Sequence, residues 1–161
     1  MTGRYFAAIC MRGHFANGMI GSQIQRLIPA RCKDCGAPII TECQSCSTPL
    51  LGYYRDVMSV NFEPDMFCTG CGQPYPWADR EAIVHHLENL LLYSDALDHA
   101  ARLEVTEQLE ILASPSKPEK SRVAAGERIK RLAPQAWSLA GPIVTTIVSA
   151  EMKSKLGLPP A

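Results

Sequence analysis

The pattern of apolar and polar residues changes near Trp77. Before this residue, short apolar runs alternate with glycine, proline and asparagine, a pattern that predicts short strands joined by turns. After it, apolar residues recur every three or four positions, which is the period of a helix. The expected strands cover residues 4–9, 39–41, 50–54 and 57–62. The pattern therefore predicts an α+β fold in which short antiparallel hairpins precede a helical module.

The first predicted helix begins after Asp79. An aspartate carboxylate in this place can accept a hydrogen bond from a free backbone N–H of the first turn. Four apolar side chains then recur at the i, i+4, i+7 and i+8 positions, so they share one helix face: Ile83, Leu87, Leu90 and Leu91. Such a stripe is typical of a helix that packs on a core.

Two further helices are expected before residue 134. The second follows a break near residues 94–95 and places its apolar positions at Leu97, Ala101, Val105, Leu109 and Leu112. The segment 114–118 contains two prolines, which interrupt a helix because each lacks a backbone N–H. A third helix is therefore expected over residues 119–133.

A last helix, which brings the total to about four, has no charged residue between positions 136 and 150. Pro142 is expected to start or kink it. These fifteen residues fall short of the roughly 20 apolar residues that cross a bilayer, so no transmembrane segment is predicted. A core helix, a helix for self-association or partner docking, and an interfacial membrane helix all fit its apolar stripe of Trp137, Val144, Ile147, Val148 and Met152.

All seven cysteines lie within the first 71 residues, and six of them form three C-x-x-C pairs. Two cysteines three positions apart, joined by a tight turn, can direct both sulfurs at one ion about 2.3 Å away. The remaining Cys10 is followed by Gly13 and His14, whose imidazole supplies an eighth donor, and eight donors make two tetrahedral sites. The sequence therefore predicts two zinc ions per chain, held by Cys10, His14, Cys32, Cys35, Cys43, Cys46, Cys68 and Cys71.

Two pairings of these donors are open. In the sequential pairing, Cys10 and His14 join the first C-x-x-C pair, and the second pair joins the third. The intervening segments of 17 and 21 residues are each long enough for a β-hairpin, which would give two zinc ribbons. In the alternative, the first and second pairs join each other, and Cys10 and His14 reach the third pair. The sequential pairing is favoured. In both pairings Cys10 needs a partner, and Gly13 supplies a turn that could bring His14 round to it.

A disulfide framework and a redox motif are the alternatives to zinc. The apolar run at residues 5–11 is too short for a secretory signal and lacks a cleavage context, which favours a cytoplasmic protein. In a reducing compartment, paired C-x-x-C motifs indicate metal or redox chemistry rather than structural bridges. A thioredoxin-like motif would occur once, between a strand and a helix, and none of the three pairs has that setting.

Composition indicates a globular chain with segregated charge. Hydrophobic residues make up 47%, charged residues 20%, and the formal net charge is zero, which argues against disorder. Residues 79–110 hold eight acidic and two basic residues, whereas residues 117–131 hold six basic and two acidic. We expect the two stretches to face each other or to be solvated separately. The alternative is a nucleic-acid-binding surface formed by Lys117, Lys120, Arg122, Arg128, Lys130 and Arg131.

Nucleic-acid binding and catalysis have less support from the sequence. In the first half, Tyr53, Tyr54 and Phe62 could stack on bases beside basic residues, but five acidic residues nearly cancel that charge. A catalytic zinc keeps one position open, whereas eight donors would close two sites. His85 and His86 are adjacent on a helix and point about 100° apart, so they cannot share an ion. We therefore expect no enzymatic activity.

The order of motifs in the first half resembles a known family. An apolar run at 5–10 precedes Gly13 and His14, three C-x-x-C turns follow, and the last turn runs through residues 74–77, Pro-Tyr-Pro-Trp, into a helix. This order resembles an uncharacterised bacterial double-zinc-ribbon family, the domain of unknown function 2321. The resemblance is close over the first half and loose over the helical tail. It implies that Cys10 and His14 are ligands and implies no activity.

The expected protein is cytoplasmic, with a double zinc ribbon over residues 1–78 and a helical domain over residues 79–161. The first part is rich in glycine, proline and cysteine, so each zinc ion is expected to contribute on the order of 10 kcal/mol that appears only on folding. The expected function is a non-catalytic scaffold or adaptor that binds a protein partner or associates with itself through the C-terminal helix. Nucleic-acid binding is the alternative function.

Overall fold

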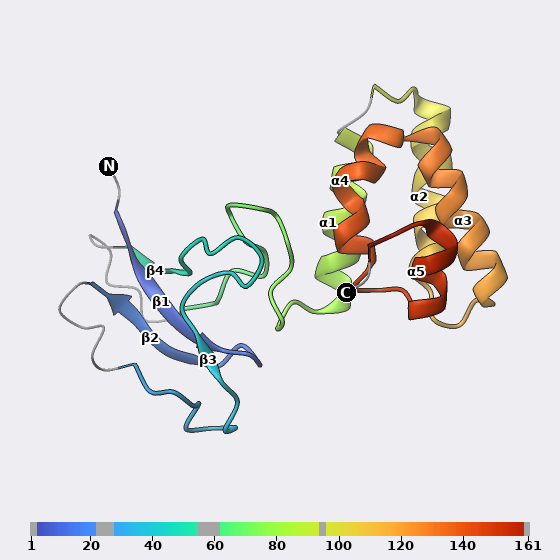
Figure 1. Cartoon of the computed structure of the whole chain (residues 1–161). Helices are drawn as coiled ribbons and strands as arrows, with labels where there is room; N and C mark the ends of the chain where they lie inside the picture. The colour runs from blue at the N-terminus through green and yellow to red at the C-terminus, as the bar shows by residue number, and fades with distance from the viewer. Residues whose placement is uncertain (1–2, 22–27, 55–61, 94–95, 160–161) are drawn as a thin grey trace. The chain divides into compact units, whose positions relative to one another are not determined.

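The computed structural model describes residues 3–21, 28–54, 62–93 and 96–159. The chain divides into two compact units, Met1–Ala78 and Asp79–Ala161. Among the described residues, the first unit contains antiparallel strands and loops, and the second contains helices (Figure 1). This is the α+β arrangement that the sequence predicts.

A four-stranded antiparallel sheet is the frame of the first unit. β1 (Arg4–Cys10) pairs with β2 (Phe15–Ile20) along one edge, and with β3 (Ile39–Ile40) and β4 (Leu51–Tyr54) along the other. β1, β3 and β4 match predicted strands. The predicted strand over 57–62 falls outside the described residues except for Phe62, which lies in no strand.

The sequence does not predict β2, because Asn17-Gly18 is a typical turn signal. In the structure both residues lie within the strand, where the pairing with β1 is irregular on both sides of Ala8. A Cβ on Gly18 would lie 2.2 Å from the Cζ atom of Phe15, so close packing excludes a larger residue. The dipeptide therefore marks an irregular strand rather than a turn.

The core of the first unit is small. Its buried residues are Ala7, Ile9, Cys43, Leu50, Cys68 and Tyr75. Phe15 is 4.4 Å from Phe62 and 5.5 Å from Tyr53 between ring centroids, so these aromatic residues pack together beside the sheet. Tyr54, in contrast, is 51% exposed and lies under the guanidinium of Arg4. Two of the three aromatic residues considered for base stacking are thus used in packing.

Five helices form the second unit: α1 (Arg80–Tyr93), α2 (His99–Ala113), α3 (Glu119–Leu132), α4 (Pro134–Val144) and α5 (Ala150–Leu156). The first three match the predicted helices. The backbone N–H of Ala82 donates to the Asp79 carboxylate at 2.7 Å, which confirms the predicted cap of α1, and Asp98 caps α2 in the same way. The predicted break at residues 94–95 lies outside the described residues.

The last predicted helix is two helices, so the expectation of about four becomes five. Pro142 does not start a helix; it lies inside α4, two residues before the end, where its missing N–H removes only one helical bond. The hydroxyl of Thr145 donates to the Pro142 carbonyl at 2.6 Å. α5 then begins after Ser149, whose hydroxyl accepts from the N–H of Met152 at 3.2 Å.

The apolar stripe of this last region is part of the helical core. Four of its five residues are buried and Val148 is half-buried, as expected for a core helix. α3 packs against α2, α4 and α5, and α1 packs against α2 and α4. The fully buried side chains of this core include Leu87, Leu91, Val105, Leu112, Ile129 and Met152.

Two arginines fasten the end of α2 to the segment between α4 and α5. Arg122 donates to the carbonyl of Leu112 at 2.9 Å and to that of Ile147 at 3.1 Å. Arg80 donates to the carbonyl of Ala113 and, at 3.4 Å, to that of Ile147. Cations are favourable at a helix C-terminus because the last carbonyls have no partner within the helix. The guanidinium of Arg122 therefore forms hydrogen bonds within the fold.

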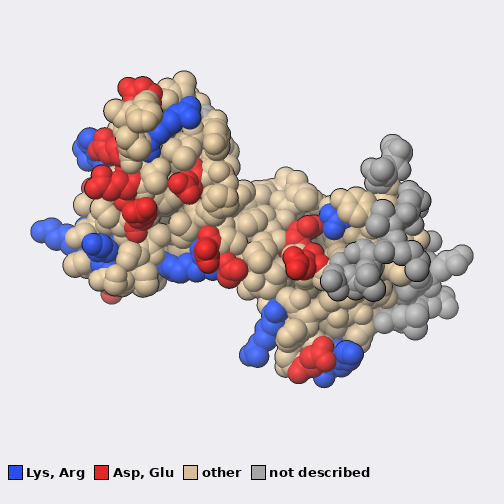
Figure 2. Space-filling model, turned by 180° about the vertical axis from the view of Figure 1, so that it is seen from behind, with Lys and Arg blue, Asp and Glu red and all other residues tan. Residues whose placement is uncertain are grey.

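The acidic stretch of residues 79–110 covers α1 and most of α2, and the basic stretch covers most of α3, which packs against α2. Arg128 forms an ion pair with Glu104 across these helices, as the expected pairing requires. Lys155 of α5 pairs with Glu119 at 2.7 Å. On the face drawn in Figure 2, acidic and basic side chains are interspersed over the helical unit. None of the described helices has the length and apolar character needed to cross a membrane.

Candidate metal centres

The three C-x-x-C segments share one backbone conformation. In each, the N–H of the first cysteine donates to the carbonyl five positions later, and the N–H four positions later returns a bond to that cysteine, all at 2.8 or 2.9 Å. A single antiparallel bridge closes each turn. We call them knuckle 1 (Arg31 to Pro38), knuckle 2 (Glu42 to Pro49) and knuckle 3 (Phe67 to Pro74).

The residue after the second cysteine of each knuckle adopts a left-handed conformation. Gly36 and Gly72 do so at φ 71°, where glycine has no steric penalty. In knuckle 2 the residue is Ser47, at φ 56°, the one non-glycine residue with positive φ within the described chain. This conformation costs a non-glycine residue roughly 1–2 kcal/mol. Knuckle 2 therefore carries local strain that the other two avoid.

Centre 1 combines knuckle 1 with the turn between β1 and β2. Cys10 ends β1, and its N–H donates to the carbonyl of His14 at 2.9 Å across a turn that Gly13 makes at φ 85°. The N–H of Met11 donates to the carbonyl of Pro38 at 3.0 Å and so holds knuckle 1 beside this turn. The result is a group whose ligand atoms all lie within 4.8 Å of one another: Cys10, His14, Cys32 and Cys35.

Centre 2 combines knuckles 2 and 3. Its four cysteines, whose sulfurs also lie within 4.8 Å of one another, are Cys43, Cys46, Cys68 and Cys71. A Cβ on Gly70 would lie 2.2 Å from the hydroxyl oxygen of Thr48, so this glycine allows the two knuckles to meet. The first cysteine of each knuckle is buried in the core and the second is exposed. The eight donors are thus grouped in the sequential pairing.

Donor separations in both centres match a tetrahedral site. A zinc-sized ion 2.3 Å from two sulfurs separates them by about 3.8 Å, and a sulfur and a nitrogen by about 3.6 Å. In centre 1, Cys35 Sγ is 3.8 Å from Cys10 Sγ, and His14 Nδ1 is 3.2 and 3.6 Å from the two knuckle sulfurs. In centre 2, the two sulfur pairs across the knuckles are 3.5 and 3.7 Å apart. No disulfide joins any of the seven cysteines, all of which are described.

Backbone N–H groups point at the sulfurs and favour the thiolate form. Burial raises the pKa of Cys32, but the N–H groups of Asp34 and Cys35 outweigh it and bring the pKa down to about 7. Similar N–H to sulfur contacts of 3.2 to 3.4 Å reach Cys10, Cys43 and Cys68. Metal ligation requires deprotonated sulfur, so these contacts prepare the turns for an ion.

The thiols of centre 2 cannot all lose their protons side by side. Burial raises the pKa of Cys68, yet the N–H groups of Cys71 and Gly70 lower it to about 6. Burial also raises the pKa of Cys71, and despite the N–H of Gln73 the neighbouring sulfurs bring it to about 12. Each thiolate therefore disfavours deprotonation of the neighbouring thiols by charge repulsion. A cation at the middle of the four sulfurs compensates this repulsion.

A side-chain hydroxyl also contacts centre 2, and the sequence analysis missed it. Thr48 Oγ1 lies 3.1 Å from the sulfur of Cys46. This contact has no local signal in the sequence, because a threonine two positions after a cysteine is common without such a role.

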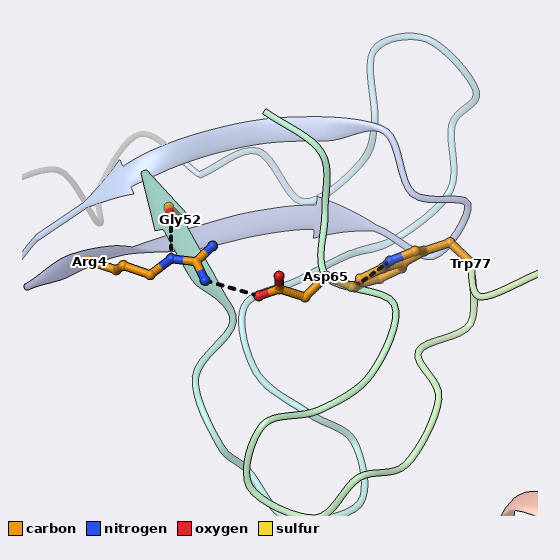
Figure 3. A network of polar contacts seen from close by, with 4 residues as sticks. All are labelled: Arg4, Gly52, Asp65 and Trp77. Atoms are coloured by element: carbon orange, nitrogen blue, oxygen red, sulfur yellow. Dashed lines mark hydrogen bonds and ion pairs between the residues drawn. The ribbon is translucent and has the colours of Figure 1, made fainter. Parts of the chain in front are cut away.

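A polar network holds the segment that leads into knuckle 3. Arg4, at the start of β1, donates to the carbonyl of Gly52 at 2.9 Å and pairs with the Asp65 carboxylate at 3.4 Å (Figure 3). The indole N–H of Trp77 donates to the Asp65 carbonyl at 3.0 Å. These contacts join both sides of knuckle 3 to the sheet, which positions its cysteines opposite knuckle 2.

The donors of both centres all come from the first unit. His85 is on the exposed face of α1, 3.3 Å from the Asn89 side-chain nitrogen and 3.8 Å from a Glu88 carboxylate oxygen. Within the described residues, the two centres are the groups of three or more His, Cys, Asp or Glu side chains close enough to share an ion.

A family model described as "Uncharacterized protein conserved in bacteria (DUF2321)" matches residues 4–156. The chain belongs to this family. The DUF2321 match covers both centres and all five helices, so the helical unit is as much a part of the family as the two knuckle centres. No curated protein and no solved structure matches the chain.

Proposed function

We propose that this protein is a non-catalytic zinc-binding scaffold of the bacterial cytoplasm that binds a protein partner. The observation that carries the proposal is the closure of both donor sets. Centre 1 offers three sulfurs and one imidazole nitrogen, and centre 2 offers four sulfurs. Zinc is the ion that such donors favour in a tetrahedral arrangement, and four protein donors are typical of structural zinc.

Full ligand sets support a structural role rather than catalysis. A catalytic zinc keeps a position for water or substrate, and in a tetrahedral site four protein donors leave none. The cytoplasmic location has separate support, because seven unpaired thiols persist in reducing compartments. In this proposal the ions hold the knuckles in place and the sheet presents the binding surface.

A hollow of about 370 Å³ on the first unit supports partner binding there. It is lined mainly by apolar residues, including Phe6, Ile20, Ile28 and Pro49, with Glu42 among them. Phe6 in this lining is 45% exposed. Exposed apolar residues around a hollow are typical of a surface that a partner covers.

Self-association through the last helices has less support, because their apolar stripe packs inside the helical unit. On α4 the large apolar residue that stays exposed is Leu139, at 58%. Light scattering on the wild-type chain and a Leu139→Glu variant tests this possibility. We expect the same mass for both; a dimer that the substitution dissolves would instead favour association through α4.

Co-purification from a bacterial host that carries the family tests partner binding. We expect a stoichiometric protein to accompany the wild-type chain and to be lost with Phe6→Asp, while two zinc ions remain bound in this variant. Tyr93→Asp is the matched control, since Tyr93 is 76% exposed on the helical unit. A partner that persists in Phe6→Asp, or a wild-type chain that retains none, would contradict the proposed surface.

Nucleic-acid binding gains no specific support from the described residues. Tyr53 and Phe62 pack against Phe15, and Arg128 pairs with Glu104. Affinity for generic DNA and RNA as a function of salt tests this alternative. We expect no binding that weakens steeply with salt, whereas a steep dependence would indicate phosphate contacts.

A further inference from the structure

Centre 2 differs from centre 1 in the groups that surround its sulfurs. One of its four sulfurs, that of Cys46, contacts a side-chain hydroxyl, from Thr48. In centre 1, the contacts described for the sulfurs come from backbone N–H groups, neighbouring thiols, His14 and the Asp34 carboxylate. A metal-bound thiolate has no proton, so a hydroxyl beside it must be the donor. We propose that Thr48 is a positioning residue that holds centre 2 closed by donating to the thiolate of Cys46.

The turn itself does not require the hydroxyl of Thr48. Its carbonyl accepts the N–H of the first cysteine, as the carbonyls of Ala37 and Gln73 do at the same place in knuckles 1 and 3, and neither of those residues has a hydroxyl. Alanine is therefore compatible with this backbone. The threonine hydroxyl is free to serve the sulfur 3.1 Å away.

The position of this hydroxyl is fixed from the opposite knuckle. A side chain on Gly70 would come within 2.2 Å of the Thr48 oxygen, so the oxygen sits against the knuckle 3 backbone where the two halves of centre 2 meet. The Gly70 N–H donates to the sulfur of Cys68 at 3.4 Å. Gly70 thus leaves room for the Thr48 hydroxyl, and its own N–H is a donor to the sulfur of Cys68.

Hydrogen bonds to metal-bound sulfur lower its charge and its reactivity, and loss of such outer contacts typically weakens metal binding about 10- to 100-fold. The inference rests on zinc binding as the proposed function. Its specific content is that the Thr48 hydroxyl strengthens metal binding at centre 2, whereas no side-chain hydroxyl has this role at centre 1.

Alkylation of zinc-loaded protein in the presence of a competing chelator tests this dependence. Mass spectrometry of the digested chain follows each cysteine separately, so the centre 1 cysteines report on the folding of the same unit. We expect Thr48→Ala to speed alkylation at centre 2 about 10-fold or more, with centre 1 unchanged. Thr48→Ser, which restores the hydroxyl, should react as the wild type does.

Thr69→Ala, one position after the first cysteine of knuckle 3, is the matched control and should change neither centre. With cobalt in place of zinc, Thr48→Ala should also shift the sulfur-to-cobalt absorption band, whereas the control should not. Equal acceleration at both centres, or an unchanged rate in Thr48→Ala, would overturn the inference while leaving zinc binding intact. A wild-type chain that holds no metal would instead overturn the proposed function and this inference together.

Discussion

The two units of this chain are stabilised by different means. The first has strands of two to seven residues, and two of the six buried residues in its core cluster are metal-ligand cysteines. The second buries apolar faces of five helices and has no cluster of metal donors among its described residues. In the proposed function, coordination bonds therefore stabilise a small region that cannot bury enough apolar surface, whereas packing stabilises the helical region. We therefore expect perturbations that destabilise one unit to leave the stability of the other unchanged.

Removal of metal should produce the largest difference in stability between the two units. We expect a strong chelator to unfold Met1–Ala78 and leave the helices folded, because each structural zinc contributes on the order of 10 kcal/mol to folding. The chain has two tryptophans, one in each unit. In a Trp137→Phe variant, the fluorescence of Trp77 reports on the first unit, while circular dichroism reports on the helices.

The fluorescence of Trp77 should change on chelation and recover when zinc is restored. The helical signal should stay close to its starting value throughout. Loss of both signals at one chelator concentration would show that the two units are not independently stabilised.

A cavity in the helical core should destabilise the second unit and leave the first unit folded. Leu87 is fully buried in α1, so Leu87→Ala should destabilise the second unit by about 2–5 kcal/mol. Both zinc ions should stay bound. Thermal unfolding followed by helical circular dichroism measures the loss, and Leu103→Ala, at a residue 61% exposed, is the control that should change little. Zinc loss in Leu87→Ala would contradict the proposal that the two units are stabilised independently.

Knuckle backbones should respond to the residue at their left-handed position. Ser47→Gly should stabilise the first unit by up to about 1 kcal/mol because it removes strain, partly offset by glycine's entropy. Gly72→Ser, the reverse change at φ 71°, should destabilise it by about 1–2 kcal/mol. Zinc competition with a chelator measures both changes. Equal affinities in the two variants would show that this position does not limit the knuckles.

Surface charge should contribute least. Arg128 and Glu104 are both partly exposed, and ion pairs of this kind typically contribute 0–1 kcal/mol, less at high salt. Arg128→Ala should therefore lower the stability of the helical unit by less than about 1 kcal/mol, with no effect on the first unit. Denaturant unfolding at low and high salt measures this difference. A larger loss that salt does not reduce would indicate that the basic stretch has a structural role beyond its charge.

The C-x-x-C turns could be predicted from the sequence because their signal is local. All three have two cysteines three positions apart and a proline three positions after the second cysteine. All three also have the same set of hydrogen bonds, although Ser47 takes the place of the glycine in knuckle 2. The pairing of the knuckles is not local, since the connecting segments allow both schemes. It is decided by contacts between segments far apart in the sequence, such as that of Met11 with Pro38.

The missed features are those in which tertiary packing overrides a local signal. Asn17-Gly18 indicates a turn, but packing against Phe15 keeps it in β2. The uncharged stretch of 136–150 suggests one helix, yet the hydroxyl of Ser149 starts a new one after a short break. The role of the Thr48 hydroxyl becomes visible only when the sulfur that it contacts is placed in space.

Native mass spectrometry of the intact chain tests the central claim most directly. We predict two zinc ions on the wild-type protein, one on a Cys32→Ser/Cys35→Ser variant and one on a Cys68→Ser/Cys71→Ser variant, because each centre holds its own ion. His14→Ala should weaken the first ion alone. A wild-type chain that carries no zinc, or whose sulfurs are oxidised to one another, would contradict the account.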